Sequence, residues 1–260
     1  MSVTPAFEKA RADGRAALVG YLPAGFPDVD GGIEAMRAMV AAGCDVIEVG
    51  LPYSDPVMDG PTIQAAAQQA LEGGVRTRDV LRTVEAVAGT GVPVVVMTYW
   101  NPVERYGVER FAADLAAAGG AGAITPDLIP DEAGPWLAAS EEHDLDRVFL
   151  VAPSSTEARL RSTTAACRGF VYAASTMGVT GTRATVSDAA ETLVRRTRAV
   201  APDLPVCVGL GVSDGAQAAE VAAFADGVIV GSAYVRELLE GRGTDGVRTL
   251  TADLAQGVRA

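Results

Sequence analysis

Two carboxylates, Glu48 and Asp59, lie eleven positions apart in one short stretch of the chain. Glu48 stands inside the apolar run 46–49, whereas Asp59 lies in a segment rich in glycine and proline. A glutamate in such a run is buried or points into a cavity, and burial raises its pKa toward the range where it exchanges protons near neutrality. The pair therefore suggests acid/base chemistry. A structural ion pair at Glu48 and an ordinary turn at Asp59 are the alternatives.

The scarcity of other reactive side chains points the same way. The chain has one histidine, His143, expected at the solvated end of a helix, and one lysine, Lys9, expected in the N-terminal helix. A histidine-activated nucleophile or a Schiff base would have to use one of them, so carboxylates are left to handle the protons. The three cysteines, Cys44, Cys167 and Cys207, are widely spaced in apolar or glycine-rich context. We interpret them as buried thiols, since they suit neither a disulfide framework nor a zinc site.

Composition narrows the class of protein further. Of the 260 residues 49% are hydrophobic and 21% are charged, as in a well-packed globular protein. A net charge of −12, with arginines scattered along the chain, disfavours nucleic acid as a partner. No apolar run reaches the roughly 18 residues that span a bilayer, and the first residues lack the core of a signal peptide. We therefore expect no membrane partner and a cytoplasmic location.

Short apolar runs alternate with longer amphipathic stretches, which is typical of βα units and a parallel sheet. The runs predicted as strands are 17–22, 46–49, 94–98, 122–125, 147–151, 169–173, 206–209 and 227–230. The stretches predicted as helices are 31–42, 78–88, 108–118, 131–142, 156–166, 187–199 and 215–223. Eight such units in about 250 residues predict an α/β fold, a (β/α)8 TIM barrel, with an extra N-terminal helix over 4–12. Because no linker divides the chain, we expect one domain over 1–260; a doubly wound open sheet is the alternative.

Glycine clusters follow the last three predicted strands, at 178–182, 209–213 and 231–233. Their backbone N–H groups, with a helix N-terminus at Ser232, can hold a phosphate without a lysine. Barrels commonly bind phosphate after the seventh and eighth strands, although any one cluster taken alone is more simply a tight turn. Segment 178–185 also has the composition of a lid, and 56–60 is its expected counterpart across the mouth.

Two motifs resemble a known family. The sequences EVGLPYSDP at 48–56 and DGPTIQ at 59–64 closely resemble the signature of the tryptophan synthase alpha subunit. Tyr172 and the glycine motifs follow in the order and spacing of that family, so the resemblance covers nearly the whole chain. It implies a retro-aldol cleavage of indole-3-glycerol phosphate to indole and glyceraldehyde 3-phosphate, without a cofactor or a metal.

The resemblance also implies roles for particular residues. Glu48 would be the general acid/base, and Asp59 would accept a hydrogen bond from the indole N–H. Tyr172 would pack near the substrate, and Thr180 would hydrogen-bond the loop aspartate on closure. The residues expected to hold the phosphate are Gly181, Gly211, Gly231 and Ser232.

A partner is implied as well. In the family the alpha subunit docks on a pyridoxal-phosphate beta subunit in an alpha2-beta2 complex, and indole passes between them. Pro56, Asn101 and Pro102 match surfaces that face this partner.

Four positions depart from the commonest family pattern: Pro23, Phe26, Trp100 and Leu210. None belongs to the acid/base pair. Two other functions stay open. One is a phosphosugar epimerase, although such barrels generally use metal-binding histidines or a lysine. The other is a catalytically idle relative that only regulates a beta subunit, which intact Glu48 and Asp59 argue against.

Overall fold

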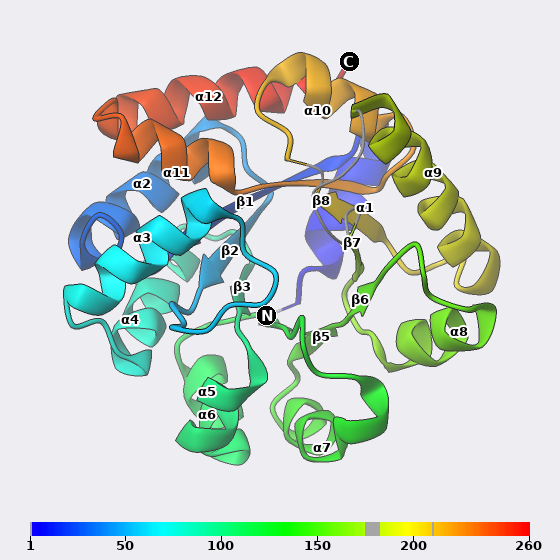
Figure 1. The fold of residues 1–260 in the computed structure, drawn as a ribbon, viewed down its shortest axis with the longest axis horizontal. Helices are drawn as coiled ribbons and strands as arrows, with labels where there is room; N and C mark the ends of the chain where they lie inside the picture. Colours follow the sequence, from blue (N-terminus) through cyan, green and yellow to red (C-terminus); the bar gives the residue numbers. More distant parts are fainter. Residues whose placement is uncertain (1, 175–182, 210) are drawn as a thin grey trace.

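The computed structural model describes residues 2–174, 183–209 and 211–260. Parallel strands form a nearly closed barrel with helices around it (Figure 1). The strands are β1 (Ala17–Pro23), β2 (Val46–Gly50), β3 (Val94–Met97), β4 (Gly122–Ile124), β5 (Asp146–Val148), β6 (Leu150–Val151), β7 (Val171–Ala174), β8 (Val206–Gly209) and β9 (Gly227–Val230). The predicted TIM barrel is therefore confirmed.

The order of the strands shows how the barrel closes. It runs β5-β4-β3-β2-β1-β9-β8-β7-β6, and every pair of neighbours within it is parallel. The two ends of this order, β5 and β6, are separated in the chain by Phe149 alone. They are the two halves of the predicted strand 147–151, so the first and last strands of this order are consecutive in the chain and the sheet closes into a barrel. The alternative of a doubly wound open sheet is wrong.

Helices alternate with the strands and cover the outside of the barrel (Figure 1). They are α1 (Thr4–Ala12), α2 (Val29–Ala42), α3 (Pro61–Glu72), α4 (Thr77–Ala88), α5 (Trp100–Tyr106), α6 (Val108–Ala117), α7 (Gly134–Glu142), α8 (Glu157–Ala166), α9 (Arg183–Val200), α10 (Gly215–Ala222), α11 (Ser232–Leu239) and α12 (Gly243–Gly257). The predicted helix 131–142 is instead a short 3-10 turn, Pro130–Glu132, followed by α7. No helix was predicted for α3, α5 or α12. None of the helices in the described ranges is both apolar and long enough to cross a bilayer.

Local sequence explains several helix starts. Asp28, Thr156 and Asp214 each precede a helix, and each side chain accepts a hydrogen bond from a backbone N–H in the first turn. Such caps satisfy donors that have no partner inside the helix. These caps fix the residue at which each helix of the outer layer begins.

The amino-terminal helix α1 closes the bottom of the barrel. Phe7 of α1 packs on Phe170 with ring centroids 5.5 Å apart, within an inner core that fills the barrel below the mouth. The fully buried carboxylate of Asp146 accepts the Val3 backbone N–H at 2.8 Å and pairs with Arg168 at 3.2 Å. This tie holds the segment before α1 against the start of β5.

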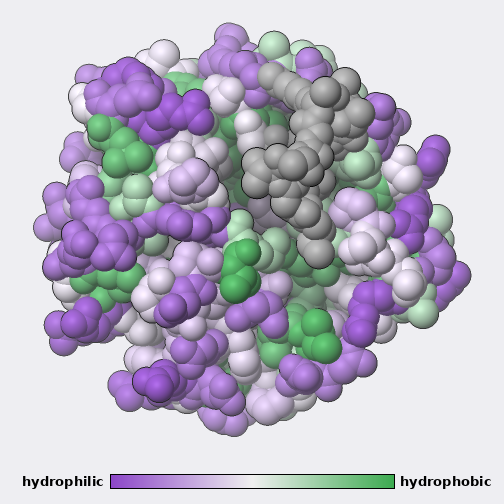
Figure 2. Space-filling model, viewed as in Figure 1, coloured by the Kyte–Doolittle hydropathy of each residue, from purple (hydrophilic) through white to green (hydrophobic). Residues whose placement is uncertain are grey.

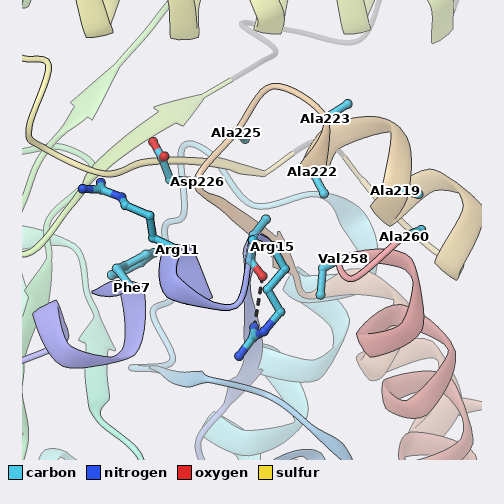
Figure 3. Close-up of a pocket in the computed structure, with 12 residues that line it drawn as sticks. Phe7, Arg11, Arg15, Ala219, Ala222, Ala223, Ala225, Asp226, Val258 and Ala260 are labelled. Carbon is cyan, nitrogen blue, oxygen red and sulfur yellow. Dashed lines mark hydrogen bonds between the residues drawn. The ribbon is translucent and has the colours of Figure 1, made fainter. Parts of the chain in front are cut away.

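A cavity of about 340 Å³ lies at this lower pole, beside α1 and the end of α12 (Figure 3). Arg15 there donates to the Ala16 carbonyl at 3.1 Å and pairs with Asp45 at 2.7 Å. Asp226, on the same wall, pairs with Arg198 at 3.0 Å. These four charged groups pair with one another, whereas Arg11 also lines the cavity and the remaining lining is rich in alanine.

Candidate active site

Glu48 lies in the middle of β2, flanked by β1 and β3, with a side chain only 3% exposed. Burial, followed by repulsion from Asp59, raises its pKa to about 8. In the described part of the chain its Oε2 atom has no hydrogen-bond partner. The carboxyl group is therefore protonated at neutral pH and free to give that proton to a bound molecule.

Asp59 lies in the loop between β2 and α3 and is half-buried. Burial raises its pKa, and a hydrogen bond from the Tyr99 side chain opposes that rise. The Tyr99 oxygen also accepts the backbone N–H of Met58 at 3.1 Å. Tyr99 thus holds the tip of the loop so that Asp59 lies close enough to Glu48 to affect its pKa. The structure brings the two predicted carboxylates together at the barrel mouth.

A cavity of about 160 Å³ opens beside Asp59. Its walls come from the carboxyl-terminal ends of β3, β4, β6, β7 and β8, and from the loop after β2. The lining residues are Met58, Asp59, Met97, Ile124, Pro126, Leu150, Tyr172, Ala174 and Gly209. Apolar walls with a single carboxylate suit a flat apolar group that carries one hydrogen-bond donor.

Tyr172 contributes to this cavity, as predicted. Its hydroxyl lies against Gly209 of the neighbouring strand β8, where the backbone carries no side chain. Burial, followed by the nearby Glu48, holds the pKa of Tyr172 far above its ordinary value. Tyr172 is therefore a neutral wall of the cavity with a polar tip.

The described phosphate residues of the prediction follow β8 and β9, next to the cavity wall that Gly209 forms. Strands β8 and β9 are paired, so Gly211, two residues after β8, and Gly231, directly after β9, belong to the same edge of the barrel. Gly211 is exposed with φ of 65°, a conformation that glycine adopts easily. Ser232 is the first residue of α11. Thr180 and Gly181, together with Leu210 and the part of the proposed lid at 178–182, lie outside the described residues.

The three residues predicted to face a partner are also near one another in the fold. Pro56 is half-buried in the loop after β2, and Asn101 and Pro102 lie in the first turn of α5. The Asn101 amide donates to the Tyr53 hydroxyl at 3.2 Å, and the Tyr53 ring lies 5.2 Å from that of Tyr99. The loops after β2 and β3 are therefore joined.

Hydrophobic residues reach the surface on this face of the barrel (Figure 2). Those most exposed near the mouth are Val57 at 77%, Met58 at 42% and Ile129 at 41%. Exposed apolar side chains next to a functional opening are typical of an interaction surface.

Sequence reasoning missed several residues of this site. Tyr21 and Tyr99 lie beside the carboxylates, yet each was assigned no role. A signal was present, because both are tyrosines at or just beyond the carboxyl end of a predicted strand. Of the family departures, Phe26 is only 1% exposed and packs in the core between sheet and helices.

The other reactive side chains lie away from the mouth. Lys9 is exposed on α1, and His143 follows the last turn of α7. Cys44 and Cys207 are buried as expected, but Cys167 is half-buried because it follows the end of α8. The residues that the structure describes include no group of three or more His, Cys, Asp or Glu side chains placed to hold a metal.

An apolar cavity with a protonated carboxyl group beside it, at the carboxyl-terminal mouth of a parallel barrel, defines a TIM-barrel enzyme. The family model described as "Tryptophan synthase alpha chain" matches residues 7–257. The chain belongs to this family. The predicted family and enzyme class, a carbon–carbon lyase that cleaves indole-3-glycerol phosphate, are confirmed, and the epimerase alternative is wrong.

Individual relatives are similar over their whole length. The tryptophan synthase alpha chain of Nocardia farcinica is 66% identical over 254 residues, covering 98% of this chain and 94% of that one. The alpha chain of Thermobifida fusca is 63% identical over 258 residues, covering 97% and 96%.

Solved structures agree with these relatives. A structure of Mycobacterium tuberculosis tryptophan synthase has a TM-score of 0.94 and 63% identity, covering 99% of this chain and 98% of that one. The alpha subunit from Legionella pneumophila has a TM-score of 0.90 at 30% identity, with coverage of 99% and 98%. The fold therefore persists where less than a third of the residues are shared.

Proposed function

We propose that Glu48 and Asp59 carry out the family's lyase reaction in this chain, on indole-3-glycerol phosphate bound across the mouth. One observation supports the assignment: burial and Asp59 raise the pKa of Glu48 to about 8, and two residues that interact with Glu48, Asp59 and Tyr172, both line the apolar cavity. The indole ring matches the apolar walls, and its N–H is the single donor that Asp59 would accept.

The proposed steps conserve protons and electrons. Glu48 gives its proton to C3 of the indole ring, and the positive charge that develops on the ring is stabilised by ionised Asp59 at the N–H. The Glu48 carboxylate then takes the proton of the adjacent glycerol hydroxyl. The carbon–carbon bond breaks, its electrons return to the ring, and indole and glyceraldehyde 3-phosphate leave with Glu48 protonated again. The protonated ring serves as the electron sink, so no lysine is needed.

The glycine edge is proposed to hold the phosphate. Gly211, Gly231 and Ser232 offer backbone N–H groups next to the first turn of α11, where the helix dipole favours an anion. Gly181 would add a further N–H group, and Thr180 would reach the loop aspartate on closure. In this proposal the phosphate would lie beyond the β8 wall of the cavity, where Gly209 lies, with the reacting bond between the phosphate and the ring.

The proposed partner is a tryptophan synthase beta subunit, in an alpha2-beta2 complex. Pro56, Asn101 and Pro102 would face it, and the exposed Val57 and Met58 support an apolar contact on the same side. Because Asn101 is bonded to Tyr53, a partner there would bear on the loop that carries Asp59. We further propose a cytoplasmic location, with no nucleic acid or membrane partner.

Indole release from purified protein tests these roles. We expect Glu48→Gln and Asp59→Asn each to lower the rate of indole formation by about 100-fold or more, the usual contribution of a general acid/base or of charge stabilisation. Glu85→Gln, an exposed carboxylate on α4, is the matched control and should retain full activity. Full activity in Glu48→Gln or Asp59→Asn would contradict the assignment.

The partner has a separate test. Adding a beta subunit should speed indole formation, and Asn101→Ala should weaken that effect without changing the rate of the isolated chain. A chain that makes no indole alone, yet still activates the beta subunit, would instead support the idle regulatory relative.

A further inference from the structure

Tyr21 lies on β1 directly opposite Glu48 of β2 in the parallel register. One layer below, Val19 and Val46 are paired in the same way, and both belong to the inner core of the barrel. Side chains two residues apart on a strand share a face. Tyr21 and Glu48 therefore both point into the barrel, one layer nearer the mouth.

Two glycines make room for the Tyr21 ring. A Cβ atom at Gly231 would lie 2.9 Å from the Tyr21 Cδ1 atom, and one at Gly50 would lie 2.4 Å from the Tyr21 hydroxyl oxygen. The Tyr21 ring therefore extends from the side of β9 toward β2. Its hydroxyl fills the space that a side chain at position 50 would occupy. Because positions 48 and 50 share a face, that place is next to Glu48 on the side of the mouth.

Within the described residues, neither the Tyr21 hydroxyl nor the Oε2 atom of Glu48 makes a hydrogen bond. Tyr21 is 9% exposed, and no hydrogen bond from its hydroxyl is found among the residues in the described ranges. Glu48 Oε2 is likewise without a partner there. Burial, then Asp59 and Glu48, hold the pKa of Tyr21 well above its ordinary value, so it keeps its proton. A donor on β1 and an acceptor on β2 therefore lie at paired positions of neighbouring strands without being bonded to each other in this state.

On the basis of the proposed function of Glu48, we propose that Tyr21 is the positioning residue of Glu48. The Tyr21 hydroxyl, held over Gly50, donates a hydrogen bond to the Glu48 carboxylate once Glu48 has given up its proton. The bond keeps the carboxylate aimed at the cavity while it waits for the proton of the glycerol hydroxyl. A phenylalanine at position 21 would fill the same space between the glycines without this donor.

The effect on Glu48 has a definite sign. A hydrogen bond to the ionised form favours that form, so its loss raises the pKa of Glu48. The other titratable groups that face Glu48 are Asp59 in the loop after β2, Tyr172 on β7 and Cys207 on β8. The pKa values of Tyr172 and Cys207 are raised far above neutrality, so among the described groups Asp59 is the one that acts on Glu48 as a charge.

The test is an infrared titration of the substrate-free chain, followed through the carbonyl stretch of the protonated Glu48 carboxyl group and identified by its loss in Glu48→Gln. In Tyr21→Phe we expect the midpoint of this titration to rise by about half to one pH unit, the equivalent of one hydrogen bond. The falling alkaline limb of the indole-formation profile should move upward by the same amount, because the reaction begins with protonated Glu48.

Two further variants keep the test decisive. Tyr234→Phe removes a buried hydroxyl that lies 3.7 Å from Cys44 Sγ, and it should leave the midpoint unchanged. Tyr172→Phe asks whether the neighbouring phenol is the donor instead. An unchanged or lower midpoint in Tyr21→Phe, or a rise in Tyr172→Phe alone, would overturn the proposal. Because this titration needs no substrate, its result tests the hydrogen bond between Tyr21 and Glu48 even if Glu48→Gln remains active and the proposed function fails.

Discussion

The Tyr172 hydroxyl oxygen lies 2.2 Å from the point that a Cβ atom at Gly209 would occupy. The two residues belong to the paired strands β7 and β8, and both line the cavity. Tyr172 can therefore keep its place only because position 209 has no side chain. The shape of the cavity depends on this one absent methyl group.

Adding that methyl group should damage the cavity. In Gly209→Ala the Tyr172 side chain must move, and overpacking of this kind costs about 1–3 kcal/mol. We expect a higher KM for indole-3-glycerol phosphate, measured by steady-state indole formation. Tyr172→Phe in the same chain should recover part of the loss, since the nearest ring atom would then be 3.0 Å away. Purely additive effects in the double-mutant cycle would contradict this coupling.

The buried Glu48 should make stability depend on pH. Its pKa is about 8 in the folded chain, whereas an ordinary glutamate titrates near 4.5. Between these values the folded state holds a proton that the unfolded state has lost, so folding becomes less favourable as pH rises. Urea unfolding of wild type and Glu48→Gln at several pH values measures this. We expect the wild type to lose stability relative to the variant from about pH 5 to pH 8, and a constant difference would show that Glu48 titrates normally.

Tyr99 should matter through the loop that it holds. Tyr99→Phe removes the oxygen that accepts the Met58 N–H and the donor to Asp59. A hydrogen bond of this kind is worth about 1 kcal/mol, so we expect KM to rise about fivefold. The pKa of Asp59 should also rise, which moves the acidic limb of the activity profile upward. Tyr53→Phe, which keeps both contacts and the ring packing, is the control; an equal effect in both variants would point to the bond between Asn101 and the Tyr53 hydroxyl instead.

The tie at Asp146 should secure α1. In Asp146→Ala the Val3 N–H and Arg168 lose their buried partner, and breaking such a pair costs about 3–5 kcal/mol. Urea unfolding should show this loss, and hydrogen exchange should show reduced protection over 4–12. Asp144→Asn removes the charge of an exposed partner of the same arginine, keeps a side chain that tolerates the φ of 54° at this position, and should change little. Unaltered exchange over 4–12 in Asp146→Ala would mean that Phe7 packing alone holds the helix.

The barrel could be predicted because its signals are local. Apolar runs, glycines after helices and amphipathic stretches all lie within a few residues of one another, so a single chain reveals them. The break at Phe149 could not be found this way, since it depends on how β5 and β6 pair with different neighbours. The same applies to α3 and α5, whose packing against the barrel outweighs weak local patterns.

The candidate site shows the same division. Glu48 and Asp59 were found because an acid in an apolar strand and a motif are visible in sequence. The contact of Tyr21 with Gly50 depends on the register between β1 and β2, which no local pattern supplies. Likewise, Tyr99 meets Met58 across two loops that are 41 residues apart in the chain. Contacts between strands or loops that are far apart in the chain are the ones that sequence reasoning misses.

The two carboxylates are carried by unlike parts of the molecule. Glu48 sits on a strand locked between two others, whereas Asp59 sits on a loop held at its tip by Tyr99. If the two residues act as proposed, a binding event at the surface would change the reaction by moving a few loop atoms, without rearranging the core. The proton donor would then stay fixed on its strand, and the contact with the indole ring would be the adjustable part.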